Sequence, residues 1–307
     1  MLTSFFVPIS LGRMKKMVAN FGAVLSIATL ALGVTACAGG SGDSPADGDK
    51  IKLVASTSIW GSIAEDITEG RDDVEVTTIL SSKDDDPHEY EATARDIAAV
   101  KGADIVVANG AGYDNWLTDN VEEGTPLVTA QPLAEGHDHG HDATNPHVWF
   151  DLDVVSEFEK KLSVELHKLN SDIPESDDDV TKKTDELKQR VEKLKGKNVI
   201  LTESVAAELI EDSNLKDITP EGFAHAVNNE SEPSAADLAA TRQLIKDKKA
   251  DILITNEQSE TPAASQLTEA AKEAGIKVVN VNETPDEGQD YFEYADALIK
   301  QLEDATK

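Results

Sequence analysis

The feature that most constrains this fold is an alternation of strand-like and helix-like segments that occurs twice along the chain. The first round has apolar, β-branched runs at residues 51–56, 74–80 and 104–108, with helical patterns at 59–68 and 91–101. The second round has strand-like runs at 198–201, 251–255 and 277–281. It also has a helical pattern from residue 204, a loop expected through residue 232 and a helical pattern at 234–248. Such alternation is typical of βα units, so we predict an α/β protein with two lobes.

A charged segment separates the two rounds. Residues 180–195 carry a thin apolar side at helical spacing, formed by Val180, Leu187, Val191 and Leu194. This pattern predicts one long, exposed helix that joins the lobes. We therefore expect an N-terminal α/β lobe at 50–175, a linker helix at 176–196 and a C-terminal α/β lobe at 197–307. A ligand should bind at the carboxyl ends of the strands, in the cleft between the lobes.

The N-terminal segment has the order of features found in secretory signals. An uncharged apolar run at 21–36 follows Arg13, Lys15 and Lys16, and it ends at Cys37. The run is short for a membrane span and its end resembles the lipobox of bacterial lipoproteins. We expect a signal peptide at 1–36, lipidation of Cys37 and a flexible Gly/Ser/Asp-rich tether at 37–49. An uncleaved anchor and an ordinary buried cysteine are the alternatives, and Met14 or Met17 could be the true start.

Composition excludes several functions. The chain has 28 basic and 59 acidic residues and a formal net charge of -31, which disfavours nucleic acid as a partner. Cys37 is the one cysteine in the sequence, so no internal disulfide framework is possible.

Two histidines directly follow prolines in loops of the first lobe. His88 lies in Asp86-Pro87-His88-Glu89 after the second strand-like run, and His147 lies in Asn145-Pro146-His147-Val148 before an aromatic pair. Either histidine alone is more often a surface residue or a hydrogen-bonded core residue. The repeated pattern in one lobe favours metal ligation by both.

Two glutamates follow strand-like runs of the second lobe. Glu203 comes after 198–201, and Glu283 comes after 277–281. Either could simply begin a helix. Together with His88 and His147 they would form an N2O2 or N2O3 site, which suits zinc or manganese.

These motifs resemble those of the metal-binding receptors of zinc and manganese ABC transporters, the cluster A-I solute-binding proteins. The resemblance covers residues 50–307 and is carried by the residues from Asp86 to Thr93 and from Asn145 to Asp151, and more weakly by Glu230 to Ser234 and Glu283 to Pro285. It implies that His88, His147, Glu203 and Glu283 are the metal ligands. The fourth position is more often aspartate in the family, and Ser204-Val205-Ala206 replaces the usual aromatic-containing sequence after the third ligand.

The same resemblance implies a rigid joining helix and a monomer without enzymatic activity. Such a receptor is anchored to the outer face of the cell membrane and delivers its ion to the membrane permease of an ABC importer. No cofactor beyond Zn2+, or alternatively Mn2+, is implied.

A second histidine-rich segment could collect metal weakly. His137, His139 and His141 alternate with aspartates and glycine in a polar loop. The loop favours zinc, two carboxylate ligands favour manganese, and a solvated loop without a role is the alternative.

Three other functions fit the sequence less well than a receptor does. A secreted zinc-dependent hydrolase would need a motif such as His-Glu-x-x-His, but Ala92 stands where the second histidine should be. A receptor for a chelated iron complex would present arginines in a motif, and none surrounds the arginines of this chain. A structural surface lipoprotein would leave the paired Pro-His loops unexplained.

Overall fold

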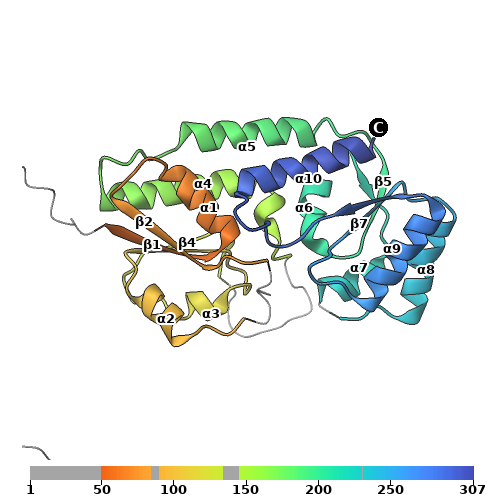
Figure 1. The fold of residues 1–307 in the computed structure, drawn as a ribbon, viewed down its shortest axis with the longest axis horizontal. Helices are drawn as coiled ribbons and strands as arrows, with labels where there is room; N and C mark the ends of the chain where they lie inside the picture. The colour runs from red at the N-terminus through yellow and green to blue at the C-terminus, as the bar shows by residue number, and fades with distance from the viewer. Residues whose placement is uncertain (1–49, 84–89, 134–144, 230) are drawn as a thin grey trace, which may run out of the picture. The chain divides into compact units, whose positions relative to one another are not determined.

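The computed structural model describes residues 50–83, 90–133, 145–229 and 231–307 (Figure 1). The segments expected to be a signal peptide and a tether, with Cys37, lie outside the described residues. So do His88, His137, His139 and His141. Within the described part, no helix has both the length and the apolar character that a bilayer crossing requires.

The first sheet is parallel, with the strand order β2-β1-β3-β4 in the described residues. Its strands are β1 (Ile51–Thr57), β2 (Val74–Leu80), β3 (Ile105–Ala108) and β4 (Leu127–Thr129). In the register, Leu53 pairs with both Val76 and Ile105, so β1 is a central strand. Val106 pairs with both Val54 and Leu127, so β3 is central too. Their near-continuous apolar sequence reflects burial on both faces of a parallel sheet.

Alternate residues of these strands enter two different cores. Leu53, Ile105 and Val107 face the side covered by α1 (Ser58–Ile67) and α4 (Leu152–Leu169). Val54 and Val106 face the other side with Val100 and Leu117, which belong to α2 (Ala94–Lys101) and α3 (Asn115–Thr118). The strand period of two therefore separates the two helical layers of the lobe.

The second sheet is also parallel, with the order β6-β5-β7-β8 among the described residues. Its strands are β5 (Asn198–Leu201), β6 (Lys216–Asp217), β7 (Ile252–Thr255) and β8 (Lys277–Asn280). The helices that follow are α6 (Ala207–Glu211), α7 (Glu221–Asn228), α8 (Ala235–Lys246), α9 (Pro262–Ala274) and α10 (Tyr291–Ala305). Ile200 and Leu253 pack with Phe223, Ile245 and Leu267 on one face of this sheet.

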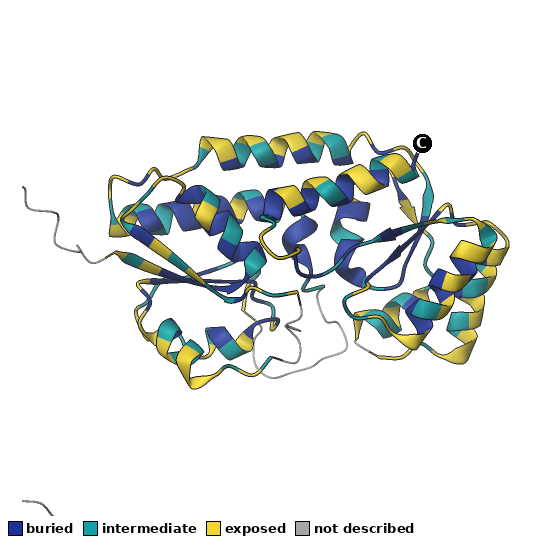
Figure 2. Cartoon of the chain, in the orientation of Figure 1, coloured by how far each residue is buried: buried dark blue, intermediate teal, exposed yellow. Residues whose placement is uncertain are grey.

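One large core joins the two lobes. It contains Leu53 of the first sheet, Val199 of the second and Leu298 of α10, all essentially inaccessible to solvent. Helix α10 contacts β8, α1 and α5 (Asp178–Val191), so the last helix of the chain packs against elements of both lobes. Figure 2 shows the resulting buried sides of α4 and α10. Two α/β lobes are thus present, as the sequence predicts.

The helix between the lobes differs in its end point and its burial from the exposed helix predicted over residues 180–195. Helix α5 ends at Val191, and its buried residues Val180, Thr184, Leu187 and Val191 form one continuous side against the core. Lys183 pairs with Asp66 of α1 at 2.7 Å. The helix is therefore packed along one side and exposed on the other, while its role as a rigid joint stays a prediction.

The expected loop through residue 232 is wrong. This segment contains the short strand β6 and the helix α7. Helix α7 is short, with Phe223 buried and Val227 packed against the same cluster, and Lys216–Asp217 is exposed. Both elements therefore give a weaker sequence signal than the longer elements.

Candidate metal site

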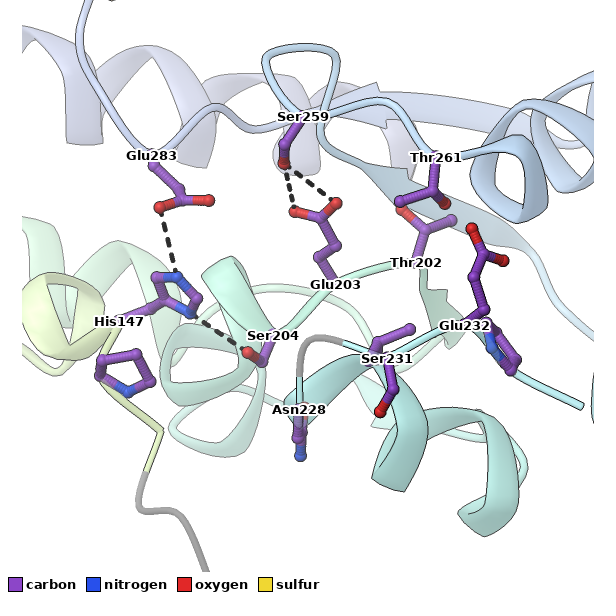
Figure 3. Close-up of a pocket in the computed structure, with 13 residues that line it drawn as sticks. His147, Thr202, Glu203, Ser204, Asn228, Ser231, Glu232, Ser259, Thr261 and Glu283 are labelled. Carbon is purple, nitrogen blue, oxygen red and sulfur yellow. Dashed lines mark hydrogen bonds and ion pairs between the residues drawn. The ribbon is translucent and has the colours of Figure 1, made fainter. Parts of the chain in front are cut away.

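Three of the four predicted ligands line one pocket. His147, Glu203 and Glu283 share a cavity of about 600 Å³ with a set of polar neighbours that includes Thr202, Ser204, Asn228, Ser231, Ser259 and Thr261. Figure 3 shows that His147 and Glu203 point toward the loops that carry Glu283 and Ser259. Glu203 comes two residues after β5 and Glu283 three residues after β8, so both stand at the carboxyl edge of the second sheet, as expected for an α/β ligand site.

The imidazole of His147 is buried and held by its Nδ1 atom. The residue is 7% exposed, and Nδ1 lies 3.0 Å from Asn145 Oδ1 and 3.1 Å from Ser204 Oγ. Because Asn145 Oδ1 can only accept a hydrogen bond, the network assigns the proton to Nδ1. The lone pair of the neutral ring is then on Nε2, which lies 3.5 Å from Glu283 Oε2.

The amide of Asn145 is itself oriented by the second lobe. Its Nδ2 donates to Glu208 Oε1 at 2.9 Å and to the Ser204 carbonyl at 3.3 Å. Burial raises the pKa of the Glu208 carboxyl, and the hydrogen bond from Asn145 opposes that rise. With both donors committed to Glu208 and Ser204, the amide oxygen must face His147.

Glu203 is held by the loop that follows β7. Ser259 Oγ donates to the carboxylate, 3.1 Å from Oε1 and 3.0 Å from Oε2. Asn256 Nδ2 donates to Oε2 at 2.7 Å. These donors stabilise the ionised carboxylate in a partly buried position.

Glu283 is buried to 7% exposure and has contacts from both lobes. Tyr113 OH donates to Oε2 at 3.2 Å, and Asn256 Nδ2 lies 3.4 Å from Oε1. Gln258 Oε1 accepts the backbone N–H groups of Glu283 and Thr284, each at 3.1 Å. A buried carboxylate favours the entry of a positive ion.

The described residues bring the predicted ligands together in part. His147 and Glu283 approach directly, whereas Glu203 is connected to Glu283 through Asn256. Among the described residues, no group of three or more His, Cys, Asp or Glu side chains is arranged closely enough to hold a metal ion. His88 is outside the described residues, so its part in the site is not tested.

Three residues of this network are not predicted from the sequence. Asn256 directly follows β7 and Gln258 comes two residues later, at the same edge of the sheet as Glu203 and Glu283. Tyr113 follows the glycine turn after β3. Polar residues that follow a buried strand gather at the carboxyl edge of the sheet, and the two glutamates are predicted on this ground. The same reasoning would predict Asn256, whereas Tyr113 carries no such signal.

Comparison with known proteins gives one consistent family. The family model described as "ZnuA: Zinc-uptake complex component A periplasmic" matches residues 53–305. The manganese-binding lipoprotein MntA of Halalkalibacterium halodurans is 33% identical over 52% of this chain and 52% of its own length. The high-affinity zinc uptake system protein ZnuA of Bacillus subtilis is 26% identical over 92% of this chain and 95% of its length. This chain thus spans about half the length of MntA and nearly all of the Bacillus protein.

Solved structures show the same fold. The periplasmic zinc-binding protein TroA from Treponema pallidum superimposes with a TM-score of 0.67, at 17% identity, over 84% of this chain and 99% of its own. A crystal structure of ZnuA gives 0.64 at 20% identity, over 84% of this chain and all of its own.

Proposed function

This chain belongs to the ZnuA family, and from that membership we propose that it is the extracytoplasmic metal-ion receptor of an ABC importer. It binds zinc, or alternatively manganese, and delivers the ion to the membrane permease. The printed names of its relatives include both zinc-binding and manganese-binding lipoproteins, which supports a divalent metal ion as the cargo.

The observation that carries this proposal is the pair formed by His147 and Glu283. Nε2 and Oε2 lie 3.5 Å apart in a buried pocket, and the Nδ1 network leaves the Nε2 lone pair directed toward the carboxylate. Zinc bonds of about 2.0–2.2 Å at tetrahedral angles separate neighbouring donor atoms by about 3.4 Å. The separation therefore suits two ligands of one ion.

The proposed ligand set is His88, His147, Glu203 and Glu283. Glu203 shares the pocket and is linked to Glu283 through Asn256, which supports its inclusion. His88 is included because its Pro-His motif follows β2, whose carboxyl end is at Leu80. His137, His139 and His141 are proposed as a weaker, secondary collecting loop.

We further propose binding without catalysis. A receptor site is filled by protein ligands, whereas a catalytic zinc keeps a position open for water beside a general base. The family match favours transport over the zinc-hydrolase and iron-chelate alternatives.

The proposed location is the outer face of the cell membrane, with a lipid anchor at Cys37. Several relatives are named lipoproteins, which supports this anchor. We also propose that the chain is a monomer. The proposed boundaries are a signal peptide at 1–36, a tether at 37–49, an N-terminal lobe at 50–175, a linker helix at 176–196 and a C-terminal lobe at 197–307.

Metal content and competition with a chelator test the function on the full chain purified in detergent. We expect one tightly bound ion per chain. His147→Ala should abolish tight binding because it removes the Nε2 donor, whereas His225→Ala, which changes an exposed histidine of α7, should not. A triple alanine variant at His137, His139 and His141 should keep the tight site. If the wild type binds no ion tightly, or loses it only in the triple variant, the proposal is wrong.

A further inference from the structure

One loop holds both carboxylates of the proposed site. Asn256, directly after β7, is 1% exposed and donates from the same Nδ2 atom to Glu203 Oε2 at 2.7 Å and toward Glu283 Oε1 at 3.4 Å. The two glutamates come from the ends of different strands, β5 and β8, which lie on either side of β7 in the sheet. A single amide on the central strand thus bridges the two acidic side chains.

The direction of this amide is fixed by its other end. Asn256 Oδ1 accepts the backbone N–H of Gln258 at 2.9 Å, so the oxygen cannot turn toward the carboxylates. Ser259 Oγ lies 2.8 Å from Nδ2 and donates its own proton to Glu203. The amide hydrogens are therefore directed to Ser259 and to the carboxylates, with the longer contact going to Glu283.

This bridge gives the two oxygens of Glu283 different partners and adds a second donor to one oxygen of Glu203. In Glu283, Oε1 faces Asn256 while Oε2 faces His147 Nε2 at 3.5 Å. In Glu203, Oε2 makes the short bond to Asn256, and Ser259 Oγ lies 3.1 Å from Oε1 and 3.0 Å from Oε2. A bidentate carboxylate must turn both oxygens toward the ion, and Asn256, together with Ser259 at Glu203, holds an oxygen of each glutamate in another direction.

The number of oxygens offered matters for the choice of metal. Zinc is commonly four-coordinate with nitrogen and single carboxylate oxygens, whereas manganese accepts more oxygen donors in six-coordinate geometry. A site with one oxygen from each glutamate has fewer donors and suits the smaller coordination number.

We propose that Asn256 is a selectivity-determining positioning residue, which limits Glu203 and Glu283 to one donor oxygen each and so favours zinc over manganese. This inference rests on the proposed function and concerns the same pocket. Asn256 acts through the two glutamates and does not itself bind the ion.

The test measures the dissociation constants of zinc and manganese for the full chain in detergent, by competition with chelators. Asn256→Ala removes the amide, and Asn256→Asp keeps the side-chain size and an acceptor for the Gln258 N–H while it lacks the donor. In both variants the ratio of the manganese to the zinc dissociation constant should fall by about tenfold, a typical effect of removing a partner of a metal ligand. Asn229→Ala removes an exposed asparagine amide outside the pocket lining, which donates to the His225 carbonyl, and should leave the ratio unchanged.

Cobalt provides an independent readout of coordination number. The visible bands of bound Co2+ should be intense in the wild type, as for a four-coordinate ion, and weaker in Asn256→Asp. Equal loss of zinc and manganese affinity in both variants, with an unchanged cobalt spectrum, would show that Asn256 only supports the fold and would overturn the inference. If the wild type binds neither metal tightly, the proposed function itself fails.

Discussion

The chemistry of His147 depends on a neighbour two residues away. Asn145 accepts from the ring at Nδ1 and also from the His147 backbone N–H at 3.1 Å, while Glu208 fixes the direction of the Asn145 amide. Partners of this kind hold a metal-binding imidazole in one tautomer and one orientation. The carboxylate of Glu208 therefore acts on the pocket without lining it.

We predict that Asn145→Ala weakens metal binding by about 10-fold to 100-fold, because the ring of His147 loses its main orienting acceptor. Chelator competition measures the effect, and circular dichroism checks that the fold is intact. Asn198→Ala is the matched control, since it removes an asparagine at the opposite end of β5, where the side chain donates to the Lys249 carbonyl. Equal affinities for Asn145→Ala and the wild type would contradict the assigned tautomer.

A second residue-scale prediction concerns Glu159, which is 1% exposed within α4. Burial raises the pKa of its carboxyl, and hydrogen bonds from the Asp177 N–H and Ser163 partly offset this. A carboxyl whose pKa is higher in the folded state contributes stability below its unfolded pKa, and this contribution is lost as pH rises through the folded pKa. Relative to wild type, Glu159→Gln should therefore gain about 1 kcal/mol of unfolding free energy between pH 4 and pH 7.

Urea unfolding of both proteins at several pH values measures this difference. A gap that stays constant from pH 4 to pH 7 would mean that Glu159 is ionised equally easily in the folded and unfolded chains. Glu157→Gln on the same helix is the control for the substitution itself, because that side chain is 71% exposed.

The sequence predicts His147, Glu203 and Glu283 as ligands because each follows a strand or lies in a motif that can be seen locally. It did not identify Asn256 or Tyr113 as their partners, because contacts such as Tyr113 with Glu283 join positions 170 residues apart. Hydrogen-bond partners at that separation are fixed by the tertiary fold and leave no pattern in the neighbouring sequence.

Among the elements, α2 shows how local signals set a boundary. The helix was expected from residue 91 but begins at Ala94, because Thr93 and Asp96 form a capping box. Asp96 Oδ2 also accepts from Tyr90 OH at 2.6 Å, so the cap ties the preceding residues to the helix. Apolar periodicity cannot detect such a start, but the Thr-x-x-Asp spacing can.

We predict that Thr93→Ala lowers the free energy of unfolding by about 1 kcal/mol, because an N–H group in the first turn of α2 loses its side-chain acceptor. Thr93→Ser keeps a hydroxyl at the same position and should recover most of that loss. Chemical denaturation of the three proteins measures both values. If serine and alanine destabilise equally, the methyl group of Thr93 and not its cap accounts for the effect.

Element type was predictable where the apolar pattern is strong and not where it is weak. Strands β1, β3, β5 and β7 are continuous buried runs, and all were expected. Helix α7 was missed because a single residue, Phe223, is buried in it. Its position is set by tertiary packing of Phe223 against Ile245 and Ile200 rather than by its own sequence pattern.

In the whole molecule, the two lobes are less separate than the twofold sequence pattern suggests. The repeat of βα units correctly predicts two parallel sheets, but each repeat is a local signal and says nothing about what lies between them. One of the buried clusters of the described residues includes side chains of both sheets, α1, α4, α5 and α10. Tyr291 at the start of α10 adds hydrogen bonds, with its OH donating to the Trp149 carbonyl and its N–H to Ser62 Oγ.

A shared core predicts that both lobes unfold in one cooperative transition. Leu298 of α10 is 2% exposed within this core, and Leu298→Ala should cost about 3 kcal/mol through the lost burial and the remaining cavity. Amide hydrogen exchange should show the same loss of protection in β1 of the first sheet and β7 of the second.

Leu267→Ala provides the sharper comparison, because Leu267 is fully buried in a cluster confined to the second lobe. If unfolding is one transition, this substitution must also lower protection in β1, although Leu267 has no place in the core around that strand. Loss of protection in β7 alone would show that the lobes unfold separately. An ion that binds only the folded state stabilises every part of the chain that unfolds together with its site. If both lobes unfold in one transition, an ion bound at His147 and Glu283 would therefore stabilise both sheets by the same free energy.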